Sequence, residues 1–278
     1  MDINLARKMW RTLEPYHGMI YFAPPAIERY QQLGLSGRAT YFAPRAAPMG
    51  PVPASVVTAT FFNFNPALVE RAIPEAWTIA TPAQLLEARL AGADAALRES
   101  LGDDALSSPE MLEAAELARL ATDGCTAPGR PLYAAHADLP WPTEPHLALW
   151  HAITLLREFR GDGHIAALVV EGIDGCEALV THGSEGVIPP AILQSTRGWS
   201  DEEWAAAEQR LEDRGWRKDG DVTPLGVEVR ERVERITDER AKGPWDALGG
   251  DRADRLRALV RPFSKAISSG GVFLNRPD

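Results

Sequence analysis

Apolar residues recur at helical spacing over much of the chain. Near the amino terminus this spacing predicts an amphipathic helix over residues 4–20, whose apolar stripe consists of Leu5, Met9, Leu13, His17 and Ile20. Residues 66–101 have the pattern of two or three short helices, and Thr81 followed by Pro82 is typical of the start of the last one. A further helix is expected at about residues 108–122. The first part of the chain is therefore predicted to be helical.

The second part of the chain carries clearer start and stop signals. A helix is predicted at about residues 145–159, and the following Gly161-Asp162-Gly163 predicts a turn, with a new helix beginning at His164. Further along, Ser200 and Glu203 have the spacing of a capping box, which predicts another helix start.

A short hairpin is expected after this capped helix. Asp219-Gly220 is typical of a tight two-residue turn, and Thr223 followed by Pro224 predicts the start of a long charged helix. A last helix is predicted at about residues 251–267, before a tail rich in Gly and Ser. These elements make the second part helical as well, apart from one small β hairpin.

Two proline-containing features suggest breaks in this pattern. The tetrapeptide Tyr-Phe-Ala-Pro occurs at residues 21–24 and again at 41–44. Because a proline disfavours helical geometry in the residue before it, both copies are expected to end an element and lead into a turn. Residues 123–144 concentrate Gly and Pro without apolar periodicity, which predicts an ordered linker between two halves.

The composition is that of a globular protein. The 278 residues are 45% hydrophobic and 24% charged, with a formal net charge of −10, so a polyanion would be bound against the average field. We find neither a secretory signal pattern nor a run of about 20 apolar residues, which predicts a cytoplasmic protein without a membrane partner. The two cysteines, Cys125 and Cys176, form no metal-binding or disulfide pattern.

The order of elements between residues 145 and 242 resembles that of a MarR-type winged helix. The motifs that carry the resemblance are Arg-Leu-Glu-Asp-Arg-Gly at residues 210–215 and Thr-Pro-Leu-Gly at 223–226, on either side of the hairpin. Three further segments, RAAPMGPVP, RGDGHIAAL and GWSDEEWAAAEQRL, are similar to those of an actinobacterial family of helix-turn-helix proteins. The resemblance implies a mainly α fold, with a helical N-terminal module and a C-terminal winged helix-turn-helix that has a small β wing.

The resemblance also places the helix over residues 200–214 where DNA would be read. This helix has six acidic residues and two basic ones: Asp201, Glu202, Glu203, Glu208, Glu212 and Asp213 against Arg210 and Arg214. A net negative face gives up the counterion release that supplies most of the affinity for DNA. DNA binding is therefore disfavoured by the sequence.

His164 is the first candidate for chemistry. In the first turn of a helix the positive end of the dipole disfavours the imidazolium, which would suit His164 to act as a general base or to contact a ligand. Asp162 could cap the same helix or orient the ring. A histidine that is satisfied only by local backbone groups is the structural alternative.

His17 is the second candidate, because of the residues expected near it. With Tyr21, Tyr41 and Arg45 it could line an aromatic pocket that carries one cation, suited to a flat, acidic small molecule. Plain core packing is the alternative for these residues. No spacing of side chains predicts a metal site, and the sequence identifies no cofactor.

These features predict four parts: a helical module (1–122), a linker (123–144), a MarR-like winged-helix module (145–242), and a terminal helix with its tail (243–278). The leading functional hypothesis is a small-molecule-binding protein of regulator descent, with its ligand between the two halves. The second is a DNA-binding regulator of MarR-like type, dimeric through its first and last helices. The third is an enzyme that uses His164 and His17 for acid-base chemistry.

Overall fold

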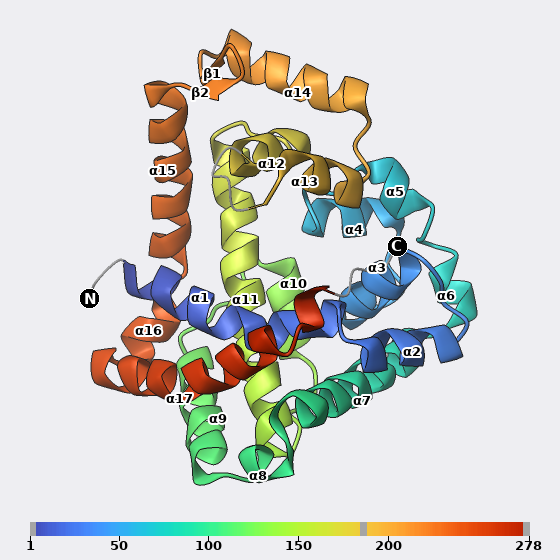
Figure 1. Cartoon of the computed structure of the whole chain (residues 1–278), viewed down its shortest axis with the longest axis vertical. Helices are drawn as coiled ribbons and strands as arrows, with labels where there is room; N and C mark the ends of the chain where they lie inside the picture. The colour runs from blue at the N-terminus through green and yellow to red at the C-terminus, as the bar shows by residue number, and fades with distance from the viewer. Residues whose placement is uncertain (1–3, 184–187, 275–278) are drawn as a thin grey trace.

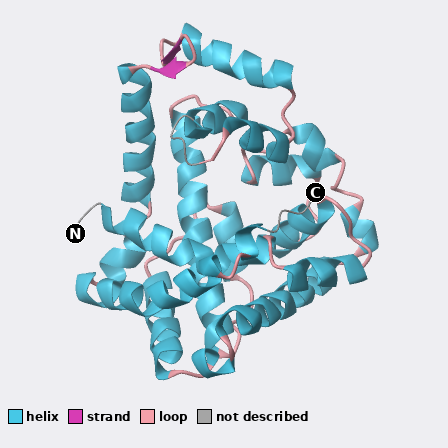
Figure 2. Cartoon of the chain, in the orientation of Figure 1, coloured by secondary structure: helices cyan, strands magenta, loops and turns pink. Residues whose placement is uncertain are grey.

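The computed structural model describes residues 4–183 and 188–274, and almost all of its elements are helices (Figure 2). The elements of the first part are α1 (Asn4–Gly18), η1 (Met19–Tyr21), α2 (Pro24–Gln32), α3 (Ala39–Ala46), η2 (Ala47–Met49), α4 (Ala54–Thr60), α5 (Pro66–Glu70), α6 (Ala76–Ile79), α7 (Pro82–Leu101), α8 (Asp103–Leu106), α9 (Pro109–Thr122) and α10 (Pro131–Ala137). Those of the second part are α11 (Pro145–Val170), α12 (Gly175–Gly183), α13 (Pro190–Arg197), α14 (Asp201–Asp213), β1 (Arg217–Lys218), β2 (Asp221–Val222), α15 (Pro224–Arg240), α16 (Gly243–Leu248), α17 (Gly250–Ser269) and η3 (Val272–Leu274). The mainly α fold that the sequence predicts is confirmed.

The long helix α11 is the central element of the molecule. Its first half packs in one large apolar core with α1, α7, α9 and α17, which surround it in Figure 1. Its second half extends away from this core, and its residues Ala167 and Leu168 pack with Ala178 of α12 and Val233 of α15. We call the elements around the large core the helical body. α11 therefore joins the helical body to the elements that follow it.

A second, small core holds α12, α13 and α14 together. Trp204, Ala207 and Leu211 form the buried face of α14 and pack on Leu179 and Leu193. Ser200 accepts a hydrogen bond from the backbone N–H of Glu203, and the Glu203 carboxylate accepts one from the N–H of Ser200. The predicted capping box is thus confirmed. We call α12, α13 and α14 the three-helix unit.

The predicted hairpin lies between α14 and α15, at the top of Figure 1. Strands β1 and β2 are antiparallel, with Arg217 opposite Val222 and Lys218 opposite Asp221. Asp219 and Gly220 both have positive φ angles, as a type I′ turn requires. The predicted cap of the next helix is also present, because Thr223 accepts a hydrogen bond from the N–H of Gly226.

The predicted turn at Gly161-Asp162-Gly163 is wrong, because α11 continues through it to Val170. A glycine in a helix costs about 1 kcal/mol relative to alanine, but this helix is buried along most of its length and its packing outweighs that cost. Gly163 has a further role, since a Cβ there would lie 2.7 Å from Nη1 of Arg130. His164 therefore lies inside a helix, and neither the dipole argument nor the capping role of Asp162 applies.

The two Tyr-Phe-Ala-Pro segments differ in the structure. At residues 21–24 the first copy ends η1 and leads into α2, as predicted. At 41–44 the prediction of a break is wrong, because the second copy lies within α3. Phe42, Ala43 and Pro44 are all buried there, and their packing holds the segment helical. Within the predicted linker the chain forms α10, which packs on α11.

Candidate functional site

A cleft lies between the helical body and the three-helix unit. It contains two neighbouring cavities, which we call the His164 pocket, of about 360 Å³, and the Arg38 pocket, of about 610 Å³. Both volumes lie in the range of ligand-binding pockets. The cavities share a wall made of Trp10, Glu14, Tyr41, Phe64, Arg157 and Arg197.

Each cavity is lined from both sides of the cleft. The helical body contributes α1 and α3 to both pockets, and α13 of the three-helix unit contributes Arg197 to both. The His164 pocket is also lined by α11, α12 and α15, and the Arg38 pocket by Ser268 of α17 and by Phe273. The cleft therefore exists only when these distant segments are folded together.

Arginines outnumber carboxylates in the described lining of the cleft. Seven arginines line it against four carboxylates: Arg11, Arg38, Arg45, Arg157, Arg160, Arg197 and Arg230 against Glu14, Glu158, Asp162 and Glu234. This excess of cations contrasts with the net charge of −10 of the whole chain. The cleft is thus a local region of positive charge in an acidic protein.

A buried chain of ion pairs crosses the shared wall. Glu158 accepts hydrogen bonds from Arg45 at 3.2 Å and from Arg157 at 2.8 Å, and Arg157 also contacts Glu14 at 3.1 Å. Burial alone would raise the pKa of Glu158, but Arg45 and Arg157 hold it well below its usual range. Glu158 is therefore ionised and fixes both arginines in place.

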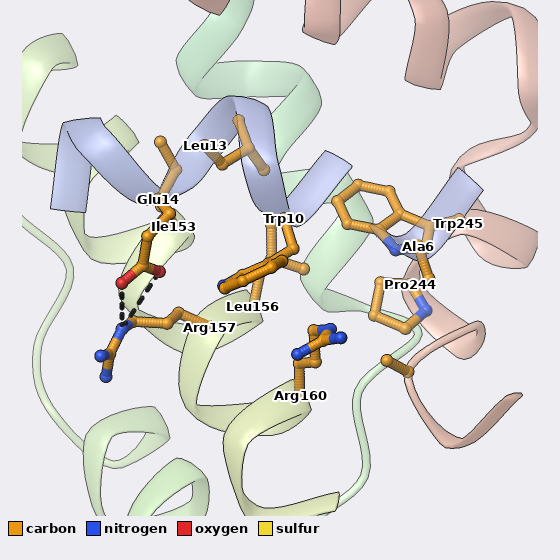
Figure 3. A pocket seen from close by; sticks show the side chains of 11 residues that line it. Ala6, Trp10, Leu13, Glu14, Ile153, Leu156, Arg157, Arg160, Pro244 and Trp245 are labelled. Carbon is orange, nitrogen blue, oxygen red and sulfur yellow. Dashed lines mark hydrogen bonds and ion pairs between the residues drawn. The ribbon is translucent and has the colours of Figure 1, made fainter. Parts of the chain in front are cut away.

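Trp10 lies beside Arg157 and Arg160 (Figure 3). The guanidinium carbon of Arg160 lies 4.5 Å from the centroid of the Trp10 ring. The cavity drawn in Figure 3 measures only about 20 Å³, which is room for about one water molecule. This cavity is therefore a packing feature of α1, α11 and α16 and not a ligand pocket.

Of the residues predicted for a ligand site, Tyr41, Arg45, Asp162 and His164 line the His164 pocket. Tyr41 also lines the Arg38 pocket, together with Tyr21. The rings of Tyr21 and Tyr41 are in contact, with centroids 5.1 Å apart. The structure thus brings five of the six predicted residues to two adjoining cavities.

His164 lines the pocket, and one of its ring nitrogens is fixed by a hydrogen bond. Nδ1 lies 2.9 Å from Oγ1 of Thr237, whose hydroxyl donates to the carbonyl of Val233. Nδ1 must therefore carry the proton, which leaves Nε2 as an acceptor without a hydrogen-bond partner among the described residues. Burial lowers the pKa of His164 to about 4, although Glu234 acts in the opposite direction.

His17 is held by the same kind of contact but lines neither pocket. Its Nδ1 lies 2.8 Å from Oγ1 of Thr154, and the Thr154 hydroxyl donates to the carbonyl of Trp150. Nε2 accepts from the hydroxyl of Tyr21 at 2.9 Å, so both nitrogens are used. His17 is fully buried, and burial lowers its pKa well below the usual value.

The two histidines do not meet directly. Thr154 and His164 are ten residues apart on α11, which corresponds to roughly 15 Å along the helix axis. Asp162 also differs from expectation, because its carboxylate accepts a hydrogen bond from the backbone N–H of Tyr133 at 2.9 Å. Burial raises the pKa of Asp162 to about 6.

Sequence reasoning missed the two arginines that face the Arg38 pocket from opposite sides. Arg38 precedes α3, and Arg197 ends α13. Neither position shows a signal in the sequence, since both arginines lie in ordinary polar surroundings. Only the packing of α13 against the helical body brings them to one cavity.

The junction of α13 and α14 is also bound to the helical body. Gly198 between them has a φ of +77°, and Asn65 donates its backbone N–H to the carbonyl of Arg197 at 2.9 Å. The indole of Trp199 donates to the carbonyl of Asn63 at 3.0 Å. The geometry is that of two helices joined by a tight turn around a glycine.

Residues 6–274 match the model of a family that is described as a helix-turn-helix family. The chain belongs to this helix-turn-helix family. Comparison with curated proteins and with solved structures finds no match. The family assignment confirms a helix-turn-helix fold, which is the fold of many DNA-binding regulators.

In this helix-turn-helix protein, however, Arg210 in the last turn of α14 and Arg214 directly after it both form ion pairs within the fold. Arg210 contacts Glu177 at 2.8 Å and Asp174 at 2.6 Å, and Arg214 contacts Glu177 at 2.5 Å. The exposed residues of α14 are Asp201, Glu202, Glu203, Ala205, Ala206, Gln209, Arg210 and Asp213. Arg210 is the one cation on this surface, and its ion pairs with Asp174 and Glu177 compete with phosphate contacts.

Two further properties concern the described residues only. Among them, no three His, Cys, Asp or Glu side chains gather in a way that could hold a metal ion. None of the described helices is long and apolar enough to cross a membrane.

Proposed function

We propose that this helix-turn-helix protein binds a small molecule in the cleft between the helical body and the three-helix unit. The observation that carries the proposal is the arginine-rich, aromatic lining of two adjoining cavities in a strongly acidic chain. Tyr21, Tyr41, Arg45, Asp162 and His164 would contact the ligand. His17 would act indirectly, by orienting the hydroxyl of Tyr21.

In this proposal the elements from α12 to α15 form a MarR-like winged helix whose wing is the β1–β2 hairpin. The order of α13, a glycine turn, α14, the hairpin and α15 supports this assignment. The winged helix would act mainly as one wall of the ligand site. We expect weak or no binding to DNA, because α14 exposes acidic residues and because Arg210 and Arg214 are held in ion pairs with Asp174 and Glu177.

Native mass spectrometry of the purified full chain tests the proposal. We expect a stoichiometric extra mass that is lost on denaturation, or binding of a component from a small-molecule extract of the host cells. S268W would fill the mouth of the Arg38 pocket and should abolish this binding. S269W is the matched control, because Ser269 is also exposed on α17 but does not line the cavity. Binding that S268W leaves intact, or no binding at all, would contradict the proposal.

A DNA-binding regulator is the second candidate, and the family assignment favours it. Fluorescence anisotropy with duplex DNA at low and moderate salt separates the two functions. Sequence-dependent binding that weakens steeply with salt would support the regulator, since phosphate contacts release counterions. Dimerisation through α1 and α17 belongs to this candidate and would appear in the same native mass spectra.

An enzyme is the third candidate, favoured by the open Nε2 of His164. A neutral imidazole that is held by Thr237 and faces a cavity could accept a proton from a bound molecule. If the bound molecule is chemically changed over time, H164N should stop its conversion while it leaves affinity intact. Conversion that persists in H164N would exclude this role.

A further inference from the structure

Arg197 is a cation with no anion beside it among the described residues. Its Nη1 donates to Oγ1 of Thr196 at 3.0 Å, and its guanidinium carbon lies 4.7 Å from the ring centroid of Phe64. Among the described residues, no carboxylate lies within 4.0 Å of it, and its Nε is buried without a hydrogen-bond partner. Leaving a guanidinium group desolvated and unpaired is unfavourable.

Other arginines increase this imbalance. Arg38 lines the same pocket and has no carboxylate partner among the described residues, while Arg45 lies in the adjoining pocket with Glu158 as its partner. Burial lowers the pKa of Arg197, and Arg38 and Arg45 lower it further, although Tyr41 acts in the opposite direction. The pocket therefore carries positive charge that the described part of the protein does not neutralise.

Six aromatic residues also line the Arg38 pocket. Trp10, Tyr21, Phe22, Tyr41, Phe64 and Phe273 all contribute to it. Such walls favour a flat ring over a flexible chain, because aromatic rings pack on each other with their faces offset or edge to face. The pocket thus combines two guanidinium groups, which have no carboxylate partner among the described residues, with surfaces for an aromatic ring.

We propose that the Arg38 pocket binds an aromatic carboxylate. The carboxylate lies between Arg38 and Arg197, and the ring packs among Tyr21, Tyr41 and Phe273. The planar guanidinium groups match the two oxygens of a carboxylate. This inference rests on the proposed function and adds to it the chemical class of the ligand and the two residues that recognise its charge.

A matched pair of probes tests the charge. Titration calorimetry would measure the affinity of the full-length protein for 2-naphthoate and for its neutral analogue 2-naphthamide. We expect the carboxylate to bind about tenfold or more tightly than the amide, because a hydrogen bond between two charged groups is stronger than one to a neutral amide. Equal affinities, or no binding of naphthoate at millimolar concentration, would overturn the proposal.

Substitutions of the two arginines locate the site. R197Q and R38Q should each weaken naphthoate binding by about tenfold and leave naphthamide binding unchanged. R252Q is the control, since Arg252 is exposed on α17 and its loss changes the net charge equally. Wild-type affinity for naphthoate in both R197Q and R38Q would overturn the assignment.

Thermal unfolding without ligand shows whether R197Q remains folded. Because the unpaired charge is unfavourable in the empty pocket, R197Q should melt at the same temperature as the wild type or higher. If R197Q melts much lower, R197K replaces it, since lysine keeps the charge but cannot make the two parallel hydrogen bonds. R197K with wild-type naphthoate affinity would then contradict the proposal.

The failure of this inference is distinguishable from that of the proposed function. If naphthoate and naphthamide bind equally and S268W blocks both, the cleft is a ligand site but the carboxylate assignment is wrong. If neither probe binds and native mass spectrometry shows no bound molecule, both proposals are wrong.

Discussion

The surroundings of His17 and His164 are built alike but differ in what remains available to a ligand. Each histidine donates its Nδ1–H to a threonine whose hydroxyl donates to the carbonyl one helical turn earlier, Thr154 for His17 and Thr237 for His164. At His17 the hydroxyl of Tyr21 uses the second nitrogen, whereas His164 lines a cavity and its second nitrogen has no hydrogen-bond partner among the described residues. The same contact thus leaves both nitrogens of His17 hydrogen-bonded within the core, whereas Nε2 of His164 remains able to accept a hydrogen bond from a ligand.

Glu158 lies on α11 between these two regions, and its loss should have the largest effect. E158Q would leave Arg45 and Arg157 buried without their carboxylate, which we expect to lower the free energy of unfolding by about 3–5 kcal/mol. Urea denaturation followed by circular dichroism would measure it. E113Q, which breaks the exposed pair with Arg255, should change little. Equal effects of the two substitutions would show that the buried ion pairs are not important for stability.

The next largest effect should separate the two histidines. H17A would remove a fully buried ring and leave the hydroxyl of Tyr21 without its acceptor, at a cost of about 2–4 kcal/mol. H164A should cost about 1 kcal/mol, because only its contact with Thr237 is lost and the cavity can admit water. Denaturation of both variants under the same conditions checks this order. A larger loss for H164A would reverse our comparison.

The buried histidines should also make the protein sensitive to acid. Burial lowers the pKa of His136 to about 3 and those of His151 and His164 to about 4, and it lowers that of His17 as well. Below the unfolded pKa of about 6.5 the unfolded chain binds more protons than the folded one. The free energy of unfolding therefore decreases, as the pH is lowered, by about 1.4 kcal/mol per pH unit for each histidine. The free energy of unfolding should therefore decrease as the pH is lowered from about 6.5 to about 4.

Asp162 contributes in the opposite direction. Because its pKa is raised to about 6, the folded state binds a proton at a higher pH than the unfolded state does. Protonated Asp162 therefore adds to stability at low pH, and this addition is lost as the pH rises through 6. The four histidines outweigh this single group. H164N should therefore make the acid-induced loss shallower, and D162N should make it steeper, in denaturation curves recorded at several pH values. A loss of stability that is independent of H164N would show that His164 does not contribute.

The smallest effect concerns the two glycines of α11 beside His164. At Gly161 the nearest atom to an added Cβ is Oε2 of Glu158 at 3.7 Å, so G161A should stabilise the helix by about 0.5–1 kcal/mol. At Gly163 the added Cβ would lie 2.7 Å from Nη1 of Arg130, which must then move, so G163A should gain nothing. Thermal melts of both variants would measure the difference. Equal gains would show that Arg130 does not restrict residue 163.

Much of the candidate site depends on contacts that no local pattern contains. The positions of Tyr21 and Tyr41 as neighbours, and of Arg45 near His164, were expected from their chemistry, and the packing places them in adjoining cavities. The roles of Arg38 and Arg197 could not be expected, because they are distant in the sequence and meet only across the cleft. The location of His17 behind Tyr21 also follows from packing alone.

The sequence by itself determined where three of the helices begin, because capping depends on a few adjacent residues. Thr81, Ser200 and Thr223 each accept the predicted backbone hydrogen bond. The type I′ hairpin at Asp219-Gly220 is local in the same way. Tertiary structure alone decided that α11 continues through Gly161-Asp162-Gly163 and that residues 41–44 are helical, because burial of whole helices outweighs the local preferences of glycine and proline. It also created the cleft, since the side chains that line it come from segments that only folding brings together.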